Sequence, residues 1–108
     1  MKKGEIYLVE LPSVNGHEQM GTRPAIILAE TEANIAIIIP LTSNIQALRF
    51  PHTVEINPSK QSGIKDVSVG LIFHIRAIDK KRIKSKMGDL EEAKIVEVNE
   101  MVKKLLVL

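Results

Sequence analysis

AIILA at residues 25–29 and IAIIIPL at residues 35–41 are two short apolar runs, and they decide the fold. Runs of this length that are rich in isoleucine are typical of buried β-strands, and the continuous apolar character of residues 35–41 indicates burial on both faces. Residues 30–34 between them are polar and are expected to form a turn. Pro40 cannot donate a backbone hydrogen bond, so we expect it to place the end of the second run at a sheet edge or a bulge.

Further strands are predicted on either side of these two runs. Residues 4–11 read as a strand that ends before Pro12, and residues 53–56 alternate as a strand does. Residues 57–65 form a loop with room for a helical turn. Residues 67–78 read as one long strand, followed by a single helical turn that Asp79 caps.

The C-terminal segment has helical periodicity instead. Asp89 followed by Glu92 fits a variant of the capping box, which predicts a helix from about Leu90 to near the end of the chain. Its apolar stripe would pack on a sheet or on a second subunit, and consists of Ile95, Val98, Val102, Leu105 and Leu106. Five or more short strands and one terminal helix predict a mostly β fold, a small antiparallel barrel or sandwich. Residues 1–108 are expected to form a single domain.

Composition excludes several classes of protein. The 108 residues contain no Cys, which rules out disulfides and thiolate chemistry. They contain three His, and no two of these have the spacing of zinc ligands. We therefore expect no metal and no cofactor. The longest wholly apolar run, residues 35–39, is far too short to cross a bilayer, so a cytoplasmic protein without a membrane partner is expected.

The net charge of +2 is unevenly distributed along the chain. Residues 1–48 carry three basic and five acidic side chains, residues 49–86 carry nine and three, and residues 87–108 carry three and five. A basic middle third is compatible with a polyanionic partner. On charge alone, however, a set of solvated strand faces and turns is the favoured interpretation.

The segment GHEQMGTRP, residues 16–24, leads into the first apolar run and is the main candidate for chemistry. Its two glycines permit a tight turn, and Pro24 biases Arg23 toward an extended backbone. The guanidinium group of arginine offers five donors in a rigid fork that matches a phosphate. The alternative is a solvated arginine in an ordinary loop.

A second polar segment, Thr42-Ser43-Asn44, follows the other buried run. A hydroxyl at a strand end can hold a phosphate oxygen, although Thr42 can equally cap the turn through the backbone. RNA can be cleaved without a metal because its 2′-hydroxyl is an internal nucleophile. Such a site needs a base, an acid and donors to the phosphate. Arg23 and Thr42 suit the donor role, and Glu18 or His17 suits proton transfer.

Several blocks of this sequence, taken in order, resemble one known family. They are KGEIYLV at residues 3–9, GHEQ at 16–19, GTRPA at 21–25, PLTSN at 40–44 and IRAIDK at 75–80. Together they resemble the PemK/MazF family of toxin endoribonucleases (mRNA interferases). The resemblance implies an SH3-like β-barrel with a C-terminal helix, acting as a homodimer. It also implies metal-independent cleavage of single-stranded RNA and inhibition by a cognate antitoxin.

The resemblance also assigns roles by position. It implies that Arg23 and Thr42 are catalytic, and that the loop of His17, Glu18 and Gln19 contacts RNA and contributes acid or base function. The predicted RNA-binding residues are Gln19, Gly21, Thr22, Pro24, Ser43, Asn44, His74 and Arg76.

One departure from the family pattern concerns Phe73 and His74, where many members carry an acidic residue followed by Gln. Either Glu18 or His17 does the work of that acidic group, or base preference and activity differ. Two alternatives therefore remain: a CcdB-type gyrase-binding toxin of the same fold, and a catalytically weakened homologue. Only three aromatic residues are present, so recognition of RNA is expected to use mostly polar edges and backbone contacts.

Overall fold

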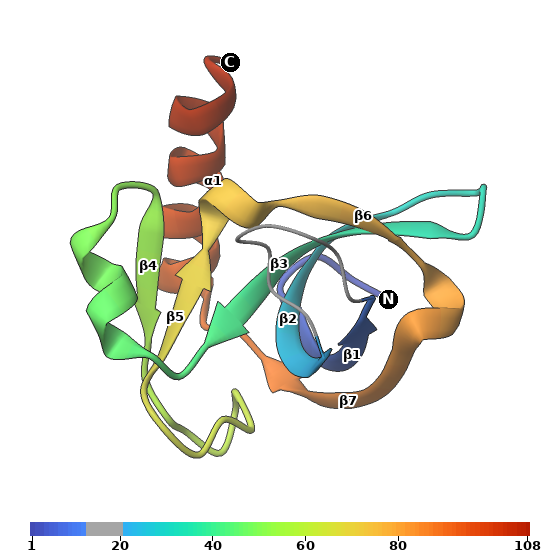
Figure 1. Ribbon diagram of the computed structural model, residues 1–108, viewed down its shortest axis with the longest axis horizontal. Coiled ribbons are helices and arrows are strands. Elements are labelled where there is room, and N and C mark those ends of the chain that lie inside the picture. The colour runs from blue at the N-terminus through green and yellow to red at the C-terminus, as the bar shows by residue number, and fades with distance from the viewer. Residues whose placement is uncertain (13–20) are drawn as a thin grey trace.

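The computed structural model describes residues 1–12 and 21–108, in which seven strands, three short 3₁₀ helices and one α-helix occur (Figure 1). The strands are β1 (Glu5–Leu11), β2 (Gly21–Glu30), β3 (Ile35–Thr42), β4 (Thr53–Ile56), β5 (Ser68–Leu71), β6 (Arg76–Asp79) and β7 (Ile83–Asp89). The helices are η1 (Ile45–Arg49), η2 (Ile72–His74), η3 (Lys80–Arg82) and α1 (Glu92–Leu106).

All strand pairs are antiparallel, in the order β4-β5-β3-β2-β1-β7, and β6 pairs with β3 beside this path. The sheet curls, so that β1, β2, β3, β6 and β7 surround a common interior, while α1 stands on the side of β4 and β5 (Figure 1). The expected mostly β fold, a small antiparallel barrel with a C-terminal helix, is confirmed. None of the described helices is long and apolar enough to cross a membrane.

Two apolar clusters form the core, one on each side of β2 and β3. Successive residues of a strand point to opposite faces, so Ile26 and Ile39 join one cluster while Ile27 and Ile38 join the other. The first cluster is covered by α1 through the buried Val98. The second is supplied by β1, β2, β3 and β6, the strands that surround the barrel interior. Burial on both faces, as predicted for residues 35–41, is confirmed.

The prediction of one long strand over residues 67–78 is wrong, because η2 divides it into β5 and β6. Both parts pair with β3: Leu41 lies opposite Gly70, and Ile38 lies opposite Arg76. Two residues of β3, numbers 39 and 40, therefore face five residues, numbers 71–75. The additional residues leave the ladder as the 3₁₀ turn. This gap contains Pro40, which has no N–H to offer a neighbouring strand.

Of the two outcomes expected at Pro40, an edge or a bulge, the edge is wrong, and the bulge lies in the partner segment and not in β3. Pro40 is buried and pairs with Ala25, and Leu41 beyond it pairs with the buried Gly70. The irregularity lies in the partner segment, where η2 bulges out of the sheet.

Asp89 is not the helix N-cap that the sequence predicts. It ends β7 and pairs with Glu5, and α1 begins at Glu92 after Glu91, whose side chain makes no capping bond. The strand β7 was not expected from the sequence. By contrast, the predicted cap at Asp79 is confirmed, because its carboxylate accepts a hydrogen bond from the backbone N–H of Lys81 at 3.0 Å.

Candidate active site

Arg23 lies within β2 and not in a loop before it, because the strand begins four residues earlier than predicted. The pairing of β2 with β1 continues out to Gly21, and Arg23 lies opposite Val9 in this ladder. Its side chain is half-buried. Gly21, at the exposed start of the strand, has φ of 86°, a conformation that glycine adopts without strain.

Thr42 ends β3, and its hydroxyl takes part in a local turn. The Oγ1 atom accepts a hydrogen bond from the backbone N–H of Asn44 at 3.2 Å, which is the capping contact that the sequence left open. An accepting hydroxyl still carries its own proton, and this proton can be donated to another oxygen. The turn contact therefore orients Thr42 without using up its donor.

The register of β2 and β3 brings these two side chains together. Ala25 pairs with Pro40, and continuing this antiparallel register by two residues places Arg23 opposite Thr42. Residues that lie opposite each other in an antiparallel pair project from the same face. Both line one pocket of about 260 Å³, together with Thr22, Pro24 and Ser43, which the sequence also predicted as site residues.

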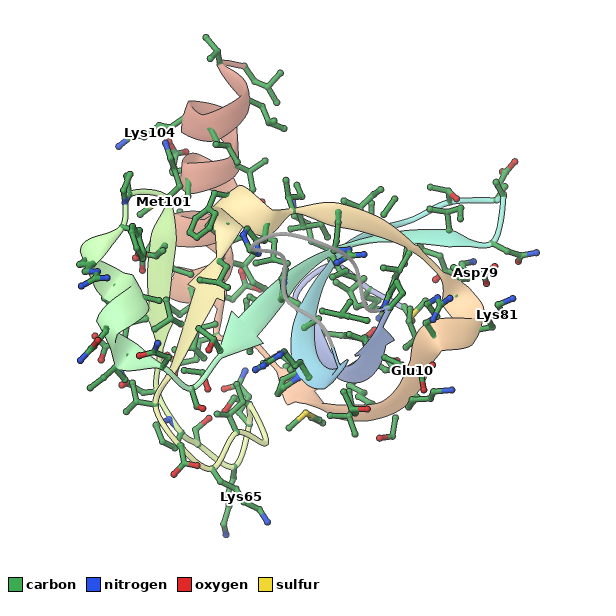
Figure 2. The ribbon with its side chains drawn as sticks, viewed as in Figure 1. Glu10, Lys65, Asp79, Lys81, Met101 and Lys104 are labelled. Carbon is green, nitrogen blue, oxygen red and sulfur yellow. The ribbon has the colours of Figure 1, made fainter. Side chains whose placement is uncertain are left out.

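The opposite wall of this pocket comes from the loop at residues 57–67, through Ile64, Lys65 and Asp66. Figure 2 shows Lys65 at the outer end of this loop. The loop packs backbone to backbone on β7: the N–H of Asp89 donates to the carbonyl of Gln61 at 2.8 Å. Sequence reasoning missed Lys65 and Asp66 because nothing in their loop indicates which strand it packs against.

A larger pocket, of about 540 Å³, adjoins the first at Thr42, which lines both. Its wall includes Asn44, whose side-chain oxygen also caps η1 by accepting from the N–H of Gln46 at 3.1 Å. His74 lies in this wall too. Phe73 and His74 also line a third hollow, of about 310 Å³, which includes Arg76.

The three hollows therefore adjoin through shared residues, and together they form what we call the groove. Among the described residues that line it, Arg23, Arg49, Lys65 and Arg76 carry permanent positive charge, whereas Asp66 is the one carboxylate. A series of adjoining hollows with excess positive charge can hold an extended polyanion. Thr42 lies where the hollows of about 540 and 260 Å³ meet.

Not every predicted site residue lies in the groove. Gly21 is absent from the described lining of all three hollows. The predictions for His17, Glu18 and Gln19 fall on residues outside the described part of the chain. Within residues 1–12 and 21–108, no three His, Cys, Asp or Glu side chains come together in a group that could hold a metal ion.

The fold and the groove define a small β-barrel protein with an excess of positive side chains along one groove. Residues 2–106 match the family described as PemK-like, MazF-like toxin of type II toxin-antitoxin system, and the chain belongs to this family. An endoribonuclease MazF from Staphylococcus epidermidis is 38% identical to it over 103 residues, which are 92% of this chain and 85% of that protein.

Solved structures of this family have the same fold. MazF from Deinococcus radiodurans is 25% identical and matches with a TM-score of 0.81, covering 100% of this chain and 97% of that one. A chain from a MazE–MazF crystal structure of the same organism is 27% identical, with a TM-score of 0.69 and coverage of 98% and 94%.

Proposed function

We propose that this family member is an endoribonuclease that cleaves single-stranded RNA without a metal ion, and that Arg23 and Thr42 stabilise the transition state. Family membership and the MazF relatives support the class of activity. The observation that carries the residue assignment is the register of β2 and β3, which puts a guanidinium and a hydroxyl in one open pocket.

In this mechanism the 2′-hydroxyl of the substrate attacks the adjacent phosphorus, and the bond from phosphorus to the 5′-oxygen breaks. The products are a 2′,3′-cyclic phosphate and a 5′-hydroxyl. Arg23 donates hydrogen bonds to the non-bridging oxygens, on which negative charge grows. Thr42 donates a hydrogen bond from its hydroxyl to the same phosphate. Removal of the 2′-proton and protonation of the leaving oxygen are assigned to Glu18 and His17, in an order left open.

The groove supplies the remaining contacts to RNA in this proposal. A single strand that passes through the three hollows would run beside Thr22, Pro24 and Ser43, then Asn44, and then His74 and Arg76. Gln19 and Gly21 complete the proposed RNA-binding set. The excess of positive side chains along this path would neutralise phosphates, which predicts weaker binding at higher salt.

We further propose that the protein acts as a homodimer and is inhibited by a cognate antitoxin. The family description supports the antitoxin partner, as does the MazE–MazF structure from Deinococcus radiodurans. A segment that covers the groove would exclude RNA from Arg23 and Thr42.

The test is incubation of the purified protein with a long RNA in excess EDTA. Discrete fragments that end in a 2′,3′-cyclic phosphate are expected, and Arg23→Ala should abolish them while the circular dichroism spectrum stays unchanged. Arg82→Ala is the matched control, since Arg82 pairs with Glu10 at 3.7 Å and is not part of the groove lining. Intact RNA with the wild-type protein would contradict the proposal, and gyrase binding in its place would favour the CcdB-type alternative.

A further inference from the structure

Two of the three aromatic residues of this chain lie exposed in the same hollow of the groove. Phe50 is 48% exposed and Phe73 is 38% exposed, and both line the pocket of about 540 Å³. Their ring centroids are 6.3 Å apart, and their planes are inclined by 69°. The third aromatic residue, Tyr7, packs against the core. Adjacent exposed rings in a hollow are a feature of binding sites, because their exposure to water is unfavourable unless a ligand covers them.

Hydrogen bonds fix the backbone segments that carry both rings before any ligand binds. The N–H of Phe50 donates to the carbonyl of Ala47 at 3.0 Å, and the hydroxyl of Thr53 donates to the carbonyl of Phe50 at 2.9 Å. The segment that carries Phe73 is tied to the same region, since the N–H of Ile72 donates to the carbonyl of His52 at 3.0 Å. The backbone that carries the two rings is therefore ordered before a ligand binds, which lowers the cost of ordering on binding.

Phe73 is exposed because η2 leaves the ladder between β5 and β6. In a strand that continued the register of Leu41 and Gly70, residue 73 would lie opposite Ile38 of β3. The 3₁₀ turn instead places the Phe73 ring in the groove, where the His74 ring meets it at 4.6 Å with an interplanar angle of 82°. The Phe50 ring has a cation beside it, because the guanidinium of Arg49 lies 5.1 Å from the centre of that ring.

We infer that this aromatic pocket, formed by Phe50, Phe73 and the residues between them and Thr42, binds one unpaired base of the RNA substrate next to the cleaved phosphate. The base stacks on Phe73, and Phe50 forms the second wall. This inference rests on the proposed function and adds a base-binding subsite to it. It follows from three observations: two fixed, exposed rings, a cation beside them, and a shared wall at Thr42.

The inclination of the two rings excludes a symmetrical sandwich, so the base uses the face of one ring and the edge of the other. Arg49 is placed to contact the phosphate that follows the stacked base. Stacking accepts every base, because each has an aromatic face. Recognition at this one position therefore depends on the presence of a base more than on its hydrogen-bonding edge. The inference thus adds one stacking contact to the polar contacts that the sequence led us to expect.

The experiment measures cleavage of short RNAs that contain the site mapped on the long RNA. In a series of these RNAs, the base of each neighbouring nucleotide is removed in turn to leave an abasic sugar. The variants are Phe73→Leu and Phe50→Leu, which keep an apolar side chain and remove the ring. Leu48→Ala is the matched control, because Leu48 is an exposed apolar residue of η1 outside the groove lining.

With the wild-type protein, kcat/KM should fall by roughly 5- to 100-fold at one abasic position beside the cleaved bond, and Phe73→Leu should cause a loss of similar size on the intact RNA. Phe73→Leu tested on the abasic RNA should lose little more activity than either change alone, because the variant and the missing base remove the same stacking contact. Leu48→Ala should leave kcat/KM unchanged.

Cleavage by Phe73→Leu and Phe50→Leu at the wild-type rate would overturn the inference and leave the proposed function standing. So would equal abasic effects in the wild type and Phe73→Leu. If the wild-type protein cleaves no RNA, the proposed function fails instead. Fluorescence anisotropy with a labelled single-stranded RNA then tests the pocket by itself. Affinity that is equal for the wild type and Phe73→Leu would overturn the base-binding inference as well.

Discussion

Replacement of Thr42 by valine separates the structural role of its hydroxyl from the proposed chemical role. Valine keeps the size and β-branched shape of threonine, so β3 should form unchanged. The lost contact is one hydrogen bond, from the N–H of Asn44 at 3.2 Å, and Asn44 is exposed. Water can replace that bond, so the free energy of unfolding should fall by about 1 kcal/mol or less.

The effect on cleavage should be much larger than the effect on stability. Loss of one donor to the charge that grows in a transition state costs about 100- to 1,000-fold in kcat, which corresponds to roughly 3–4 kcal/mol. The assay is single-turnover RNA cleavage in EDTA, with urea unfolding of the same samples. Thr42→Ser keeps the hydroxyl and is the matched control, and should retain most of the activity. Cleavage by Thr42→Val within about threefold of wild type would refute the proposed role of the hydroxyl.

Two further predictions concern the stability of the fold. A methyl group on Gly88 would lie 2.3 Å from the carbonyl oxygen of Gln61, so Gly88→Ala should reduce the free energy of unfolding by about 3 kcal/mol in urea. Among the described residues, a methyl group on Gly21 meets no atom within 4 Å, so Gly21→Ala should cost only about 1 kcal/mol for its positive φ, and equal costs would contradict the packing argument. Hydrogen bonds from Lys80 and the N-terminal ammonium lower the pKa of Glu30 from 4.5 to about 2. The stabilisation from these contacts is therefore complete above about pH 4.5 and disappears as the pH falls to about 2. Across this range the urea midpoint of Glu30→Gln should depend less steeply on pH than that of the wild type. The control Glu32→Gln should keep the wild-type slope, and the same slope for Glu30→Gln would contradict the prediction.

The core strands could be predicted because their apolar runs are long enough to be buried on both faces. Ile26 and Ile27 enter different clusters, as do Ile38 and Ile39, so both faces of these two strands are shielded from water. The same register explains why Arg23 and Thr42 share a pocket, although 18 residues lie between them in the sequence.

The division of residues 67–78 could not be predicted, because alternation shows which side chains face the core and not where a strand leaves its partner. Strand β7 was missed for a different reason. Its sequence, IKSKMGD, has little apolar alternation, and its place beside β1 is supported by Lys86, which pairs with Glu5 at 2.7 Å and with Asp89 at 3.3 Å. The contact with Glu5 joins residues that are remote in sequence, and no local pattern indicates it.

The walls of the groove were the least predictable part of the candidate site. Lys65 and Asp66 reach it because their loop packs on β7, and Phe50 reaches it because η1 folds back toward η2. Phe73 was noticed as a departure from the family pattern, yet its position beside Phe50 depends on the insertion between β5 and β6.

The position of the cleaved phosphate in a complex is the most direct test of the proposed mechanism. A crystal structure of the protein with RNA that carries a deoxynucleotide at the cleaved bond would show it, because that substrate lacks the nucleophile. The phosphate should lie between Arg23 and Thr42, with the guanidinium and the hydroxyl each about 3 Å from its oxygens. A cleaved phosphate bound elsewhere in the groove, out of reach of either side chain, would contradict the account.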